Sequence, residues 1–182
     1  MSTSSKISTS AQNYADSLIK VGQDGVMTYD AILTDLNTIK EITSNSRDLV
    51  DVMENPAIST NVKDEILYNV FSNQINEKLI NFLKVLIDKK RFYELNEIIE
   101  AYSDKVDEIY NIKRVEVVSA VDVSDDKKQK LVEKLQNKLQ KTVIANWHTD
   151  KSIIGGLVIK IDDDVIDNSL KNKLENLSKN II

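Results

Sequence analysis

The chain has 182 residues, of which 41% are hydrophobic and 29% are charged, and its formal net charge is −5. This composition is that of an ordinary globular protein, and the length suffices for one sizeable core or two small ones. The net negative charge argues against a broad nucleic-acid-binding surface, which requires clustered lysine and arginine. Cysteine is absent and His148 is the single histidine, which excludes disulfides and thiolate metal sites and leaves one residue for histidine-based catalysis.

The first residues, MSTSSKISTSAQ, are rich in serine and threonine and lack the apolar segment of a secretory signal. We interpret them as a loose N-terminal arm. No apolar stretch approaches the roughly 20 residues that a membrane-spanning helix needs. The sequence therefore predicts a protein without a membrane-spanning segment of its own.

Hydrophobic residues recur at steps of three and four over residues 11–111, and glycine and proline, which interrupt helices, are scarce. This spacing predicts six helices joined by short links. Ser8 or Ser10 is a suitable N-cap for the first helix and Thr28 for the second. Pro56 restricts the preceding residue to extended geometry and so ends the third helix. The fourth helix is predicted from Val62, Ile66, Val70 and Phe71. Six helices that each bury one apolar stripe predict a bundle.

The pattern changes near Arg114. The segment RVEVVSAVDV is rich in β-branched residues and predicts a strand, and an amphipathic helix with Ser124 as its cap follows. The segments TVIANW and IIGGLVIKI predict two more strands, VID predicts a short one, and the last residues predict a final helix. The chain is therefore predicted to be mainly α, with an N-terminal six-helix bundle at 1–112 and a small C-terminal α/β domain at 113–182.

Gly155 and Gly156 are adjacent in a chain that contains only four glycines. A dinucleotide-binding turn requires G-x-G-x-x-G directly before a helix, and a Walker phosphate loop ends in Gly-Lys-Ser or Gly-Lys-Thr. Neither pattern is present, and the strand pattern continues after the pair. We therefore interpret the two glycines as a β-bulge or a close approach of two backbone segments.

Two other features could indicate chemistry. Asp162, Asp163 and Asp164 are possible ligands of a divalent cation, but they lack the alternate acids, central glycine and terminal glutamate of a calcium loop. We interpret them as turn residues. His148 has no nucleophile beside it in the sequence, so we expect it to be partly exposed at a strand end. The sequence thus predicts no catalytic, cofactor-binding or metal-binding residues and a protein that is not an enzyme.

The fifth predicted helix carries hydrophobic residues round more of its circumference than one buried stripe requires. These residues are Leu79, Phe82, Leu83, Val85 and Leu86. Two interpretations remain open: a central helix that is buried on all sides, or one wall of a groove that receives a partner's helix. In the second case, Tyr14, Ala15 and Leu18 of the first helix supply the other wall.

Four segments, in this order, resemble the delta subunit of F-type ATP synthase, which is called OSCP in mitochondria. They are NP-I at 55–58, FLKVLIDKKRFYEL, VEVVSAV and DKSIIGGLVIKIDDDVIDNSLKNKLENL. The resemblance covers nearly the whole chain, and its last segment is the most specific. The size of the chain and its DKKRF sequence resemble cyanobacterial or plastid members more than mitochondrial ones. The expected location is therefore the plastid thylakoid, on the stromal side, with the cytoplasmic side of a bacterial or cyanobacterial membrane as the alternative.

The resemblance implies a non-catalytic stator subunit without cofactors, which links the catalytic head to the peripheral stalk and so couples proton flow to ATP synthesis. It implies that the first and fifth helices bind the N-terminal helix of an ATP synthase alpha subunit. It also implies that the C-terminal domain binds the peripheral stalk b-type subunits. The residues carried over are Tyr14, Leu18, Leu79, Phe82, Leu83 and Leu86 for the alpha subunit, and Leu170, Leu174 and Leu177 for the b-type subunits. The alternative is a helical adaptor protein of an unrelated complex.

Overall fold

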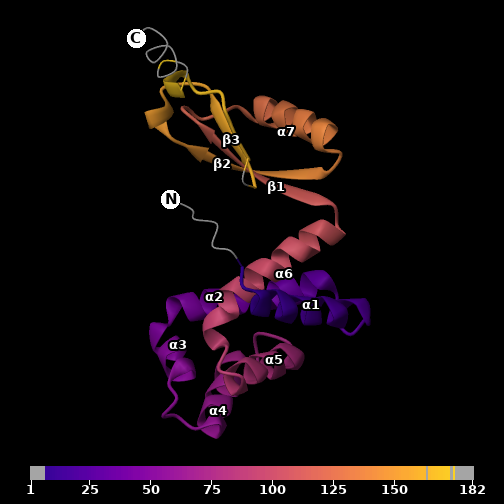
Figure 1. The fold of residues 1–182 in the computed structure, drawn as a ribbon, viewed down its shortest axis with the longest axis vertical. Coiled ribbons are helices and arrows are strands. Elements are labelled where there is room, and N and C mark those ends of the chain that lie inside the picture. The colour runs from indigo at the N-terminus through magenta and orange to yellow at the C-terminus, as the bar shows by residue number, and fades with distance from the viewer. Residues whose placement is uncertain (1–6, 163, 173, 175–182) are drawn as a thin grey trace. The chain divides into compact units, whose positions relative to one another are not determined.

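The computed structural model describes residues 7–162, 164–172 and 174. This part of the chain is mostly helical and contains a four-stranded sheet, so the predicted mainly α class with a small α/β part is confirmed (Figure 1). The chain divides into two compact units, Met1–Val106 and Asp107–Ile182, each of which is described by itself. The sequence places the boundary after residue 112 instead. No helix in the described ranges is both long and apolar enough to cross a membrane.

The described residues of the first unit form helices joined by short turns, and the last helix runs on beyond the unit's boundary (Figure 1). The elements are α1 (Thr9–Gln23), α2 (Tyr29–Asn45), α3 (Arg47–Glu54), α4 (Thr60–Phe71), α5 (Glu77–Asp88), the 3-10 helix η1 (Phe92–Glu94) and α6 (Leu95–Ile109). The helices follow the apolar spacing of the sequence, whereas the 3-10 helix was not predicted.

Two side-chain caps fix the starts of α1 and α2. The hydroxyl oxygens of Ser8 and Thr28 accept hydrogen bonds from backbone N–H groups three residues later, each at 3.1 Å. These bonds satisfy donors that a helix start otherwise leaves without partners. The end of α3 also lies where it is predicted, because Asn55, before Pro56, is extended with a ψ of 116°.

The core of the first unit is centred on α5. Leu79, Leu83 and Leu86 are each at most 1% exposed, and their spacing places them on one side of the helix. Tyr102 of α6 is also fully buried, and its hydroxyl donates a hydrogen bond to the carbonyl of Tyr29 at 3.2 Å. The core thus accommodates a polar group whose hydrogen bond is made.

The fourth helix forms where it is predicted, but its buried face differs from the one that the hydrophobic residues suggest. Val62 is 46% exposed, whereas Lys63 and Leu67 are buried. Lys63 tolerates this position because its ammonium group donates a hydrogen bond to the carbonyl of Met53, in the last turn of α3, at 2.7 Å. A lysine therefore occupies a place that the hydrophobic pattern assigns to an apolar residue.

The second unit packs one helix against a sheet of strand order β2-β1-β3-β4. Its elements are β1 (Ile112–Ser119), α7 (Asp125–Leu139), β2 (Thr142–Thr149), the 3-10 helix η2 (Lys151–Ile153), β3 (Leu157–Ile161) and β4 (Asp164–Asp167). Strands β1 and β2 are parallel, and α7 makes the crossover that a parallel pair requires. Strands β3 and β4 add to the other side of β1 as antiparallel neighbours.

One face of this sheet forms a second, smaller core with α7. Val115 and Val117 of β1 alternate with residues on the opposite face, as a strand buried on one side requires. They contact a cluster that includes Leu135 of α7, and Trp147 of β2 packs partly buried against the same cluster. Because Trp147 is the only tryptophan, its fluorescence reports on the second unit alone.

Candidate partner-binding surface

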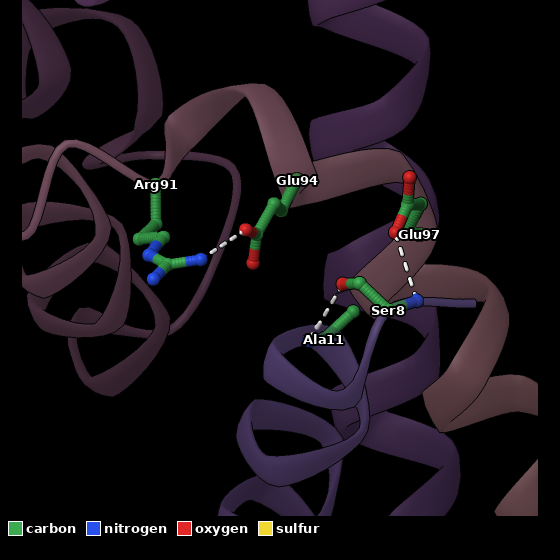
Figure 2. A network of polar contacts seen from close by, with 5 residues as sticks. All are labelled: Ser8, Ala11, Arg91, Glu94 and Glu97. Atoms are coloured by element: carbon green, nitrogen blue, oxygen red, sulfur yellow. Dashed lines mark hydrogen bonds and ion pairs between the residues drawn. The ribbon is translucent and has the colours of Figure 1, made fainter.

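Polar contacts fix the start of α1 against the start of α6 (Figure 2). The backbone N–H of Ser8 donates a hydrogen bond to Glu97 Oε2 at 3.1 Å, while the Ser8 hydroxyl oxygen caps α1 through the N–H of Ala11. Ala11 and Ala15 are fully buried, and such small side chains allow α1 to pack closely. The position of α1 is thus set by both hydrogen bonds and packing.

Glu94, on η1, forms an ion pair with Arg91 and is only 4% exposed (Figure 2). Burial alone raises the pKa of Glu94, but the side chains of Ser10, Arg91 and Tyr93 and the charge of Arg91 together bring it below its usual value of 4.5. Its second oxygen, Oε2, has no partner in hydrogen-bonding geometry among the described residues, while Oε1 accepts a hydrogen bond from Arg91. Glu94 is therefore ionised at neutral pH and anchors the turn that follows α5.

Helices α1 and α5 meet at the surface through Tyr14 and Phe82. Their ring centroids lie 6.2 Å apart and their planes are inclined by 76°, which is an edge-to-face contact. Both side chains are half-buried, so part of each ring remains exposed beside the contact. Val85, three residues after Phe82 and on the same side of α5, is 45% exposed. We call Tyr14, Phe82 and Val85 the α1–α5 surface.

The other residues predicted to line a groove lie on the same two helices but are buried. Their exposed fractions are 4% for Leu18, 1% for Leu79 and 0% for Leu83 and Leu86. These leucines support the α1–α5 surface from the core side and offer almost no area to a partner in this conformation. The sequence left open whether α5 is buried on all sides or forms one wall of a groove. Its leucines are buried, as the first interpretation expects, while Phe82 and Val85 face outward, as the second requires.

Basic side chains border the α1–α5 surface. Lys78 precedes Phe82 by four residues, and Lys89, the C-cap residue of α5, follows Val85 by four. The exposed Asp88, three residues after Val85, adds one acidic group at this end. Lys89 also lines a depression of about 420 Å³ at the start of α1, together with Ser10, Asn13, Tyr14, Ser17 and Arg91. An apolar centre between basic ends suits an amphipathic helix that carries acidic residues.

The second predicted surface lies at the end of the described chain. Leu170 is 48% exposed and Leu174 is 56% exposed, whereas Leu177 lies outside the described residues. Ile154, which is 62% exposed, comes next to Gly155, whose carbonyl accepts a hydrogen bond from Leu170 N–H at 2.8 Å. We call Ile154, Leu170 and Leu174 the C-terminal apolar patch. The sequence did not single out Ile154, because its exposure follows from a left-handed turn with a φ of 66°.

The glycine pair forms a crowded turn that leads into β3, which starts only at Leu157 rather than before the pair. A Cβ atom on Gly155 would lie 2.7 Å from the side chain of Leu170, and one on Gly156 would lie 2.3 Å from the carbonyl oxygen of Asn168. Gly156 also has a φ of 86°, which favours glycine. The predicted close approach of two backbone segments is thus confirmed.

Asp162, Asp164 and His148 belong to neither the α1–α5 surface nor the C-terminal apolar patch. Asp162 pairs with Lys113, and Asp164 begins the edge strand β4, whereas Asp163 lies outside the described residues. His148 is exposed on β2, opposite Val118. Within residues 7–162, 164–172 and 174, no three histidine or acidic side chains are grouped so that they could hold a metal ion.

The fold and these surfaces define a class of protein: two small units that each present apolar side chains suited to contacts with other proteins. The family model described as ATP synthase delta (OSCP) subunit matches residues 11–181, and the chain belongs to this family.

Curated relatives carry the same description. The ATP synthase subunit delta of Chlorobium limicola is 37% identical over 169 residues, which cover 93% of either chain. That of Clostridium botulinum is 33% identical over 168 residues, covering 92% of this chain and 93% of the relative. A chain in the structure of the Toxoplasma gondii mitochondrial ATP synthase hexamer has a TM-score of 0.67 at 18% identity, covering 96% of this chain and 98% of that one. This last likeness concerns the fold alone.

Proposed function

We propose that this chain is a non-catalytic stator subunit of an F-type ATP synthase, and that it links the catalytic head to the peripheral stalk. The observation that carries the proposal is the family match over residues 11–181, together with relatives named as subunit delta that align over more than nine-tenths of this chain. A stator resists rotation through contact area rather than chemistry, and buried apolar area stabilises such contacts. The exposed apolar side chains of both units support this role, whereas nothing in the comparisons favours a helical adaptor of an unrelated complex.

In this proposal the first unit acts as a six-helix bundle and binds the N-terminal helix of an alpha subunit at the α1–α5 surface. Tyr14, Phe82 and Val85 provide the apolar contacts, and Lys78 and Lys89 favour acidic residues at the two ends of the bound helix. The buried residues Leu18, Leu79, Leu83 and Leu86 hold the two helices in place beneath the partner.

The second unit binds the ends of the peripheral stalk b-type subunits through the C-terminal apolar patch. Leu170 and Leu174 lie four residues apart and present adjacent side chains, which suits packing against a helix. Leu177 belongs to the same proposed contact on its sequence spacing. The chain then reaches the membrane only as part of the complex, and the bacterial relatives support a bacterial membrane rather than the thylakoid.

Titration calorimetry of the full chain with a peptide from the N-terminus of the cognate alpha subunit tests the first contact. We expect one-to-one binding with a negative heat-capacity change, because the peptide buries apolar surface. Phe82→Asp should weaken binding about tenfold or more, since a carboxylate would be buried without a partner. Asn137→Asp places the same charge at an exposed position of α7, in the second unit, and should bind as the native chain does.

Circular dichroism of both variants provides the control for folding. Phe82 is half-buried at the surface, so Phe82→Asp should retain the native helical signal. Equal binding by the native chain and a folded Phe82→Asp variant would contradict the assignment of the α1–α5 surface. Unfolding of Phe82→Asp would instead place Phe82 in the core and contradict it as well.

A further inference from the structure

A second cavity of the first unit lies between the α3–α4 turn and the turn that follows α5. Its volume is about 760 Å³, which falls within the range of small-molecule binding sites. Met53, Pro56, Ile58, Ile87 and Phe92 supply its apolar wall. None of the residues predicted to bind the alpha or b-type subunits lines it, so it is separate from the surfaces described above.

Lys63 brings a positive charge to this cavity, although the residue is only 6% exposed. Its ammonium group donates one hydrogen bond, to the carbonyl of Met53, which also lines the cavity. Among the described residues it forms no other hydrogen bond and no ion pair. An ammonium group carries three N–H donors, so two of them remain for a ligand that enters the cavity.

The start of α4 faces the same space. Ser59, its N-cap, and Thr60, its first residue, both line the cavity. The Ser59 side chain makes no cap hydrogen bond, and the first turn of α4 contains no acidic residue. Helix starts with free backbone N–H groups favour anions, so this feature adds to the charge of Lys63.

We propose that the cavity binds a monocarboxylate carried on an apolar or aromatic group. The carboxylate pairs with Lys63 beside the start of α4, and the apolar group packs against the wall formed by Ile58, Ile87 and Phe92. The rim carries the exposed acidic residues Glu54 and Asp88, which disfavour multiply charged anions such as phosphates, and one exposed cation, Lys90. A free carboxylic acid and the C-terminal residue of a peptide share this chemistry.

The probes are hydrocinnamate, its neutral amide hydrocinnamide, and N-acetylphenylalanine, which represents a peptide C-terminus. Each is titrated into the full chain and followed by the amide NMR signals. We expect hydrocinnamate to shift signals of the cavity-lining residues, and hydrocinnamide to bind about tenfold or more weakly because it lacks the charge that pairs with Lys63. Stronger binding of N-acetylphenylalanine than of hydrocinnamate assigns a peptide end as the source, and the reverse order assigns a free acid.

Lys63→Met should weaken hydrocinnamate binding to the same extent, while Lys40→Met, which removes an exposed lysine of α2, should leave it unchanged. Equal affinity for the acid and the amide, signal shifts away from the cavity, or unchanged binding by Lys63→Met would overturn the proposal. If circular dichroism shows that Lys63→Met is unfolded, the comparison of hydrocinnamate with hydrocinnamide on the native chain tests whether binding requires the carboxylate charge. Tyr93→Ala, at a lining residue that is 63% exposed, then tests the location and should weaken binding.

Discussion

Glu94 contributes a buried negative charge to the first unit, and Gly156 contributes an unusual backbone conformation to the second. Glu94 is buried at the turn after α5, whereas the side chain of its partner Arg91 is 42% exposed, so solvent screens part of the ion pair. Gly156 allows the turn before β3 to pass close to Asn168. A single substitution at Glu94 tests the contribution of its charge, and one at Gly156 tests the need for its backbone conformation.

Glu94→Gln should lower the free energy of unfolding at neutral pH by about 1 to 3 kcal/mol, the range for hydrogen bonds that involve a charged group. The folded-state pKa of Glu94 is lowered, so the ionised side chain stabilises the fold fully above its usual pKa of 4.5, and this contribution is lost as pH falls through the lowered value. The difference between native chain and variant should therefore shrink in acid. Urea unfolding followed by far-UV circular dichroism measures it, with the exposed Glu41→Gln as the control. A difference that stays constant across this pH range would contradict the role of the charge.

Gly156→Ala should destabilise the second unit more than Gly155→Ala does. At Gly156 the positive φ alone costs about 1 to 3 kcal/mol, and the new Cβ would also meet a backbone oxygen. At Gly155 the new Cβ would meet the side chain of Leu170, which can rotate away. Urea unfolding followed by the fluorescence of Trp147 compares the two variants. Equal losses, or a larger loss for Gly155→Ala, would contradict the assigned packing.

For a single residue, the sequence indicates which local role the residue type suits, but not which other residues it contacts in the fold. The missing nucleotide-binding motif is enough to interpret Gly155 and Gly156 as structural. Their neighbours Asn168 and Leu170 come from a turn beyond β4, and their approach depends on how β3 and β4 pair. The burial of Lys63 could not be predicted either, since it depends on a carbonyl of α3 that comes near only in the folded unit.

Helix α5 shows which properties of an element follow from its own sequence and which depend on its neighbours. Its period of apolar residues predicts a helix, and Leu79, Leu83 and Leu86 share a side whatever surrounds them. Which of its other residues are buried depends on α1, because Tyr14 covers only part of Phe82. The α-helices of the first unit were therefore predictable, while the division of α5 into buried leucines and an exposed Phe82 and Val85 was not.

The C-terminal apolar patch yields a prediction about the proposed contact with the b-type subunits. Leu174→Asp should weaken binding of the C-terminal segment of a b-type subunit about tenfold or more, because the carboxylate would lose water at the contact. It should leave the Trp147 fluorescence unchanged, since Leu174 is 56% exposed. Asn137→Asp adds the same charge to an exposed position of α7 and serves as the control. Titration calorimetry with both variants makes the comparison, and undiminished binding by Leu174→Asp would exclude this residue from the contact.

The whole molecule joins two units with different cores and different exposed surfaces. The first unit presents the α1–α5 surface from two helices, and the second presents the C-terminal apolar patch beside a sheet. A protein that links two parts of a machine requires two such surfaces, and it requires no catalytic group. The family membership and the exposed apolar residues of each unit are consistent with this one role.

Isolation of the tagged full chain from detergent-solubilised membranes of its host tests the stator assignment most directly. The proposed function predicts that the alpha subunit and the b-type subunits of ATP synthase are recovered with the native chain. It also predicts that Phe82→Asp reduces recovery of the alpha subunit relative to Asn137→Asp. Recovery of the native chain without ATP synthase subunits would contradict the proposed function.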